Sequence, residues 1–87
     1  MPRYISQHSL ACMTRQGAEE LSKRLHREGS VSARRVLVNM HEGRMLVEFE
    51  TPGREELERW LRAEKLHFDW LLRVELESVA NGSLQAV

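Results

Sequence analysis

The sequence predicts an α+β domain whose elements run strand, helix, strand, strand, helix, strand. Residues 34–50 contain two runs of alternating side chains on either side of the turn His41-Glu42-Gly43-Arg44, which is the pattern of a β-hairpin. Segments with apolar residues at helical spacing precede and follow this hairpin. A shorter alternating run opens the chain and another lies near its end, so both predicted helices are flanked by strands.

Length and composition limit the classes of protein to which the chain can belong. Its 87 residues suffice for one hydrophobic core and not for two. The 41% hydrophobic and 30% charged residues are typical of a folded soluble domain. Thirteen basic residues balance thirteen acidic ones, so we expect neither nucleic acid nor a membrane as a partner. The chain has one cysteine, Cys12, which cannot form a disulfide within the chain. It shows no signal peptide and no apolar run of about 18 residues. Together these features predict a cytoplasmic protein.

The first strand is expected over residues 3–8, although its residues are unusually polar. The first helix is expected to begin after Thr14, because a hydroxyl can accept hydrogen bonds from the free amides of the first turn. Its buried stripe consists of apolar residues at helical spacing: Ala18, Leu21 and Leu25.

The hairpin is expected to close at Gly43, which suits a positive φ. Alternation predicts that one side of its two arms faces the core: Val36, Val38 and Met40 on the first arm, Met45, Val47 and Phe49 on the second.

The second helix is expected to begin with Thr51 as its cap and Pro52 at its first position, where the missing N–H does no harm. Its inward side is formed by Leu57, Trp60 and Leu61. The last strand is expected over residues 70–77. Residues 1–79 then form the single domain, and residues 80–87, which contain Asn81-Gly82-Ser83, form a flexible C-terminal tail.

This order of elements is that of the ferredoxin-like βαββαβ fold. Right-handed crossovers predict a four-stranded antiparallel sheet of order 4-1-3-2 with both helices on one face. The uncovered face would carry apolar residues among polar ones: Ile5, Leu37, Leu46 and Leu71. We therefore expect a homodimer formed through the open sheet face. The alternative is a monomer, since scattered exposed leucines are normal.

The same topology gathers His8, Cys12, His41 and His67 at one end of the sheet. Imidazole and thiolate groups are suitable ligands for divalent metals, so His8, Cys12 and His67 form a candidate site for nickel or zinc. The commoner case is that such histidines are solvated and that such a cysteine is a small apolar residue under a helix.

Three aromatic residues, Tyr4, Trp60 and Trp70, form a candidate ligand pocket between the second helix and the sheet. Aromatic residues at this spacing more often belong to the core. RNA-recognition motifs share the βαββαβ plan, but their base-stacking positions fall here on Arg44 and Leu46, which are not aromatic. No residues with the spacing of a catalytic motif are found.

Four short motifs carry a family resemblance: Tyr4-Ile5-x-x-His8, Leu25-His26, Glu50-x-Pro52 and Arg73-Val74-Glu75. Through them the chain from Arg3 to about Glu77 resembles a family of short bacterial ferredoxin-like proteins of unknown function that includes nickel-binding members. The resemblance implies a small dimer, in some members with metal bound through histidines. This chain has Val47-Glu48 where that family often has a cysteine, and Trp60-Leu61 where it has a histidine, so the resemblance supports fold and dimer more than metal.

Three functions follow as hypotheses. The first is a homodimeric domain that binds a small ligand or a divalent metal ion. The second is a small dimeric α/β-barrel-type enzyme, similar to monooxygenases or isomerases, which rests on fold analogy. The third is a purely structural dimerisation or partner-binding domain.

Overall fold

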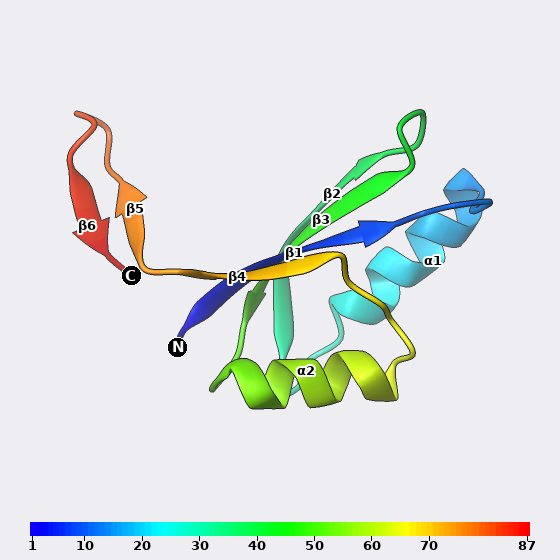
Figure 1. Cartoon of the computed structure of the whole chain (residues 1–87), viewed down its shortest axis with the longest axis horizontal. Coiled ribbons are helices and arrows are strands. Elements are labelled where there is room, and N and C mark those ends of the chain that lie inside the picture. Colours follow the sequence, from blue (N-terminus) through cyan, green and yellow to red (C-terminus); the bar gives the residue numbers. More distant parts are fainter.

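The computed structural model describes residues 1–87 and contains two helices and six strands (Figure 1). In chain order the elements are β1 (Arg3–Ser9), α1 (Arg15–Leu25), β2 (Ser32–Asn39), β3 (Arg44–Glu50), α2 (Arg54–Ala63), β4 (Trp70–Val74), β5 (Leu76–Ser78) and β6 (Leu84–Ala86). The first four strands form an antiparallel sheet of order β2-β3-β1-β4. This confirms the α+β class and the predicted strand order, which is the same order counted from the other edge.

Cross-strand pairing divides the residues of β1 between the two faces of the sheet. Tyr4 lies opposite Phe49, Ser6 opposite Val47, and His8 opposite Met45, and all six of these residues are buried. Antiparallel partners point to the same side of a sheet, and the residues between them point to the other side. The covered face therefore carries the even-numbered residues of β1, and the open face carries Arg3, Ile5 and Gln7.

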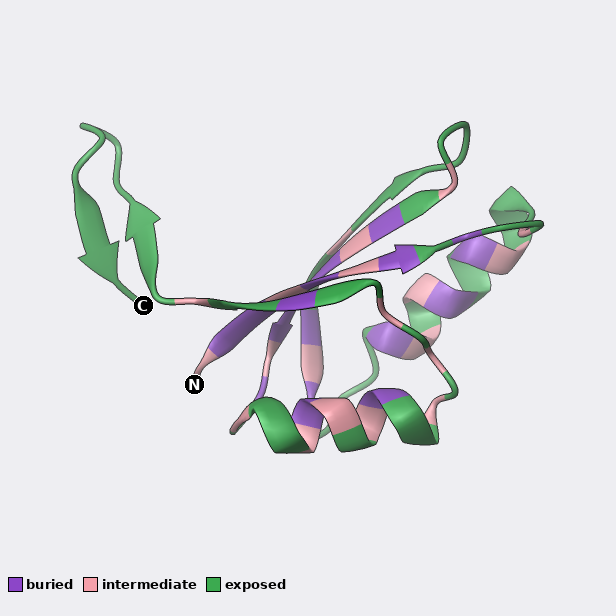
Figure 2. Ribbon diagram, viewed as in Figure 1, coloured by how far each residue is buried: buried purple, intermediate pink, exposed green.

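Both helices cover the same face of the sheet. One buried cluster contains residues of α1, α2 and all four strands: Tyr4, Leu10, Leu21, Leu25, Val31, Ala33, Met45, Val47, Phe49, Leu57, Leu61 and Leu71. Figure 2 shows the buried residues on the inner sides of the helices and on the central strands. At the centre, the rings of Phe49 and Trp60 meet edge to face with 5.8 Å between centroids.

The start of α1 is as predicted, and the start of α2 is not. The Thr14 hydroxyl accepts a hydrogen bond from the Gly17 amide at 3.0 Å and caps α1. The cap of α2 is Gly53 instead of Thr51, so Pro52 lies before the helix. Thr51 is fully buried, and its amide donates to the Pro2 carbonyl at 3.1 Å. Because that bond continues the pairing of β1 with β3, Thr51 extends the strand and cannot cap the helix.

The core-facing prediction for the hairpin is correct for β3 and only partly correct for β2. Met45, Val47 and Phe49 are completely buried, but Val38 and Met40 are exposed. The strand β2 lies at the edge of the sheet, and a hollow of about 420 Å³ separates its far end from α1, so these side chains are left open to solvent. Gly43 has a φ of 68°, so the turn closes as predicted.

The prediction that Leu71 lies on the open face is wrong. Leu71 pairs with Ser6 on the covered face and is 8% exposed, whereas Leu72 pairs with Ile5 on the open face and is 57% exposed. Both residues are leucine, so the sequence pattern of this strand fits either assignment. The register with β1 decides between them.

The predicted last strand is interrupted after Val74, where β4 ends. Residues 76–86 form a second hairpin, whereas the sequence predicts a flexible tail from residue 80. Asn81-Gly82-Ser83 forms its turn. Gly82 has a φ of 89°, and the Asn81 side-chain oxygen accepts hydrogen bonds from the Ser83 amide and hydroxyl at 3.0 and 2.8 Å. The sequence pattern does not reveal this turn or the returning strand, because only three residues pair on each side.

None of the helices is both long enough and apolar enough to span a membrane.

Candidate functional site

A buried Ser–His pair lies where β1 meets the loop that follows α2. The Nδ1 atom of His8 lies 2.7 Å from the His67 carbonyl oxygen, and Nε2 lies 2.7 Å from the Ser6 hydroxyl. A carbonyl only accepts, so Nδ1–H donates to it, and the neutral ring accepts at Nε2 from the Ser6 hydroxyl. Desolvation by burial lowers the pKa of His8 below its ordinary value of 6.5, more than the His67 hydrogen bond and the nearby Asp69 raise it. His8 is therefore neutral at neutral pH.

This pair has the spacing of an activated nucleophile, because a base lies within hydrogen-bond reach of a hydroxyl. Its position argues against that chemistry. Ser6 is 0% and His8 is 1% exposed, so no substrate carbonyl can approach the hydroxyl in this conformation. The pair instead fastens the loop after α2 to the central strand of the sheet.

The structure does not assemble the predicted metal ligands. Both ring nitrogens of His8 are engaged, while Cys12 and His67 are exposed. No group of three or more His, Cys, Asp or Glu side chains lies close enough to hold a metal ion. The expected approach of His8 to His67 does occur, but through the backbone of His67. These residues do not fit a nickel or zinc site in this arrangement, and metal binding stays a prediction from sequence.

The three residues of the predicted ligand pocket lie on different faces of the sheet. Tyr4 is buried on the covered face, and Trp60 packs against Phe49 on the same side. Trp70 pairs with Gln7, which places it on the open face. The sheet therefore separates Trp70 from the other two, and no pocket contains all three residues.

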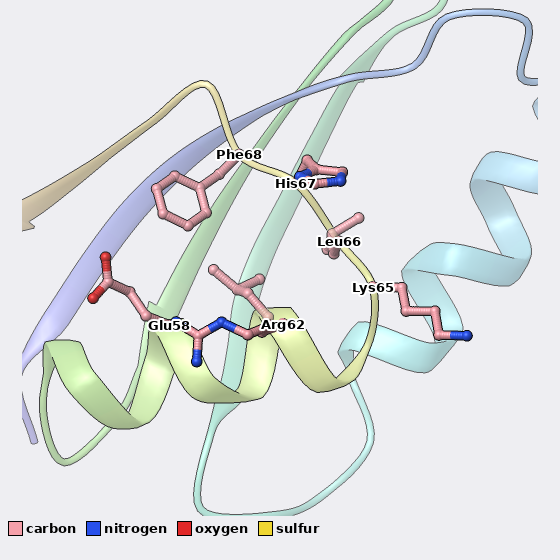
Figure 3. Close-up of a pocket in the computed structure, with 7 residues that line it drawn as sticks. Glu58, Arg62, Lys65, Leu66, His67 and Phe68 are labelled. Atoms are coloured by element: carbon pink, nitrogen blue, oxygen red, sulfur yellow. The ribbon is translucent and has the colours of Figure 1, made fainter.

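A hollow of about 580 Å³ lies between α2 and the loop after it (Figure 3). Its lining combines an apolar part, Leu61, Leu66 and Phe68, with a polar part, Glu58, Arg62, Lys65 and His67. The hollow exists because α2 ends sharply: Lys65 has a φ of 57°, and the Leu66 amide donates to the Leu61 carbonyl at 2.9 Å. The sequence did not predict this hollow, although two apolar residues, Leu66 and Phe68, in an otherwise polar loop were a signal for it.

The open face of the sheet is an uncovered surface with a regular pattern of side chains. We use the name open face for two rows of side chains across β2, β3, β1 and β4: Leu37, Leu46, Gln7 and Trp70 in one, and Arg35, Glu48, Ile5 and Leu72 in the other. Among them Leu37 is 49% exposed, Trp70 41% and Leu72 57%. Half-buried Leu46 and Ile5 lie between these exposed side chains, so apolar residues are present on all four strands of this face.

Charged side chains lie within this face and at its margin, and they form ion pairs with one another. Glu48 lies 3.7 Å from Arg3 and 3.6 Å from Arg34, and Arg34 also pairs with Glu50 at 3.2 Å. Arg3, which is buried, reaches Glu77 of β5 at 3.0 Å. These ion pairs hold the charged groups in place beside an apolar strip, which is the composition of many protein interfaces.

Neither a scan against protein-family models nor searches of the curated proteins and of the solved structures found a match to this chain.

Proposed function

We propose that the chain is a ferredoxin-like domain whose function depends on self-association through the open face. The observation that carries this proposal is the exposure of Leu37, Trp70 and Leu72 on the face of the sheet that neither helix covers. Covering such a patch with a second copy removes apolar surface from water on both subunits.

The size of the chain supports the same conclusion. A domain of 87 residues buries only about two-thirds of the surface that its unfolded chain exposes, so association would add to the stability that the core supplies. A two-fold dimer also uses the same patch on both subunits, which requires no second specialised surface. The protein would then act as a homodimeric assembly or partner-binding domain.

Replacing Leu72 with glutamate is expected to convert a dimer into a monomer. The substitution would place an unpaired carboxylate in the centre of the interface, which should raise the dissociation constant about a hundredfold or more. Sedimentation equilibrium over a range of protein concentrations measures this constant directly.

The matched control is Val38→Glu, which adds the same charge to an exposed strand residue on the other face of the sheet. It should leave the dissociation constant nearly unchanged. A wild-type protein that stays monomeric at every concentration, or a Leu72→Glu variant that dimerises as well as wild type, would contradict the proposal.

The hollow beside α2 carries a second candidate function, the binding of a small ligand. Its apolar part could receive a ring, and the two cations Arg62 and Lys65 outnumber the single carboxylate of Glu58 at its polar part. This combination favours a small aromatic carboxylate.

Benzoate is a suitable probe of this second candidate. At millimolar concentration it is expected to shift amide NMR signals of residues 58–68, and the double variant Arg62→Glu/Lys65→Glu should abolish those shifts. Glu55→Gln/Glu56→Gln, at the opposite end of the same helix, is the control. Shifts that are absent, or that persist in the charge-reversed variant, would end this candidate.

A further inference from the structure

The hairpin formed by β5 and β6 has almost no contact with the rest of its own chain. Figure 1 shows it standing apart from the sheet and both helices, and every residue from 75 to 87 is exposed (Figure 2). One ion pair, between Glu77 and Arg3, joins it to the sheet. A two-stranded hairpin without further packing is at best marginally stable in water. A surface that packs against it is therefore missing from the isolated chain.

The two faces of this hairpin differ in chemistry. Leu76 pairs with Ala86 and Ser78 with Leu84, so these four side chains share one face, and Glu77 and Gln85 share the other. On the polar face, Glu77 forms an ion pair with Arg3, which lies on the open-face side of the sheet. The apolar face is thereby directed away from its own chain, with Leu84 65% and Leu76 52% exposed.

The sheet alone offers a small area for a dimer. Four strands about 4.8 Å apart and about 20 Å long present a flat area of roughly 400 Å². Each partner of a stable dimer contributes about 800 Å². The hairpin supplies additional apolar surface next to the open face, where an associated copy would lie.

We propose that the β5–β6 hairpin is an arm exchanged between two copies of this chain, and that its apolar face of Leu76, Leu84 and Ala86 packs on the partner's sheet. This proposal rests on the self-association proposed above and deepens it, because it names a second element of the interface. The exchange is reciprocal, so the two arms hold the dimer together from both sides.

The test compares two charge-adding variants of the full-length chain on opposite faces of the hairpin. Leu84→Glu is expected to raise the dimer dissociation constant about tenfold or more, whereas Gln85→Glu should change it less than about twofold. Both positions are exposed in the isolated chain, so neither variant should alter the circular dichroism spectrum of the domain.

The outcomes distinguish this proposal from the one on which it rests. If Leu72→Glu dissociates the dimer but Leu84→Glu does not, the open-face dimer stands and the exchanged arm is overturned. A wild-type monomer overturns both. If both variants dissociate the dimer and Gln85→Glu does not, both proposals are supported.

A photo-reactive benzoylphenylalanine at position 84 tests the position of the arm directly. It is expected to form covalent dimers whose cross-linked peptide contains residues 32–39 or 70–74 of the other copy. Cross-links found only within one chain, or only to the helices of the other copy, would overturn the exchanged arm.

Discussion

Replacing Phe49 with alanine is expected to lower the free energy of unfolding by about 3 to 5 kcal/mol. Phe49 is completely buried near the end of β3, opposite Tyr4 and Ala33, and its ring meets that of Trp60. Truncation would remove the ring from the one core that both helices share and leave a cavity that the neighbouring strands cannot close. Since a domain of this size has a stability of roughly 5 to 15 kcal/mol, the loss is a large fraction of the total.

Urea unfolding followed by tryptophan fluorescence measures this loss, at one fixed protein concentration because association would add to stability. Phe49→Leu is the matched control, since it keeps an apolar side chain in the same space and should lose distinctly less. A loss below about 1 kcal/mol for Phe49→Ala would mean that the ring does not occupy the centre of the core.

The second large effect concerns His8 and pH. Its pKa is lowered in the folded protein and returns to about 6.5 in the unfolded chain. Between these two values the unfolded state binds more protons than the folded state, so the free energy of unfolding falls as the pH falls below 6.5. The contribution of His8 is complete above pH 6.5 and is fully lost once the pH is below the folded pKa. Each unit by which the pKa is lowered corresponds to about 1.4 kcal/mol.

Urea unfolding of the wild type and of His8→Leu at pH values from about 8 to about 5 tests this expectation. The variant should lack the part of the pH dependence that begins at 6.5. It should also be less stable than wild type at pH 8, because the Ser6 hydroxyl and the His67 carbonyl would each lose a buried partner at a cost of roughly 1 to 3 kcal/mol.

The same substitution at exposed His41 is the control and should have little effect on stability. An NMR titration of the His8 ring gives the folded pKa independently. A titration midpoint at or above 6.5, or equal pH dependence in wild type and His8→Leu, would show that burial does not govern this group.

The buried Ser6–His8 pair also explains why the burial of β1 is hard to predict from its polar residues. Serine and histidine alternate with Tyr4 as a solvated face would, yet all three point into the core. The pair is tolerable there because each polar atom finds a partner, one of them the carbonyl of a residue 59 positions away. The residues near His8 in the sequence do not indicate that the His67 carbonyl will be its partner.

Local chemistry did determine much of the architecture. Helical spacing identified the buried stripe Ala18, Leu21 and Leu25, and Thr14 identified the start of α1. Alternation around Gly43 identified the first hairpin, and the order of elements gave the arrangement of the sheet. Each of these depends on residues close together in the chain, where the periods of helix and strand and the conformational freedom of glycine act directly.

Tertiary structure alone decided which residues meet across the chain. The register of β4 against β1 put Leu71 in the core and Leu72 on the open face, and it placed Trp70 on the other side of the sheet from Tyr4. A non-local hydrogen bond to the His67 carbonyl occupied Nδ1 of His8, and the change of chain direction after Val74 produced the projecting hairpin. A one-residue change of register exchanges the two faces of a strand at no cost to its local pattern, so only the packing of the whole chain selects between them.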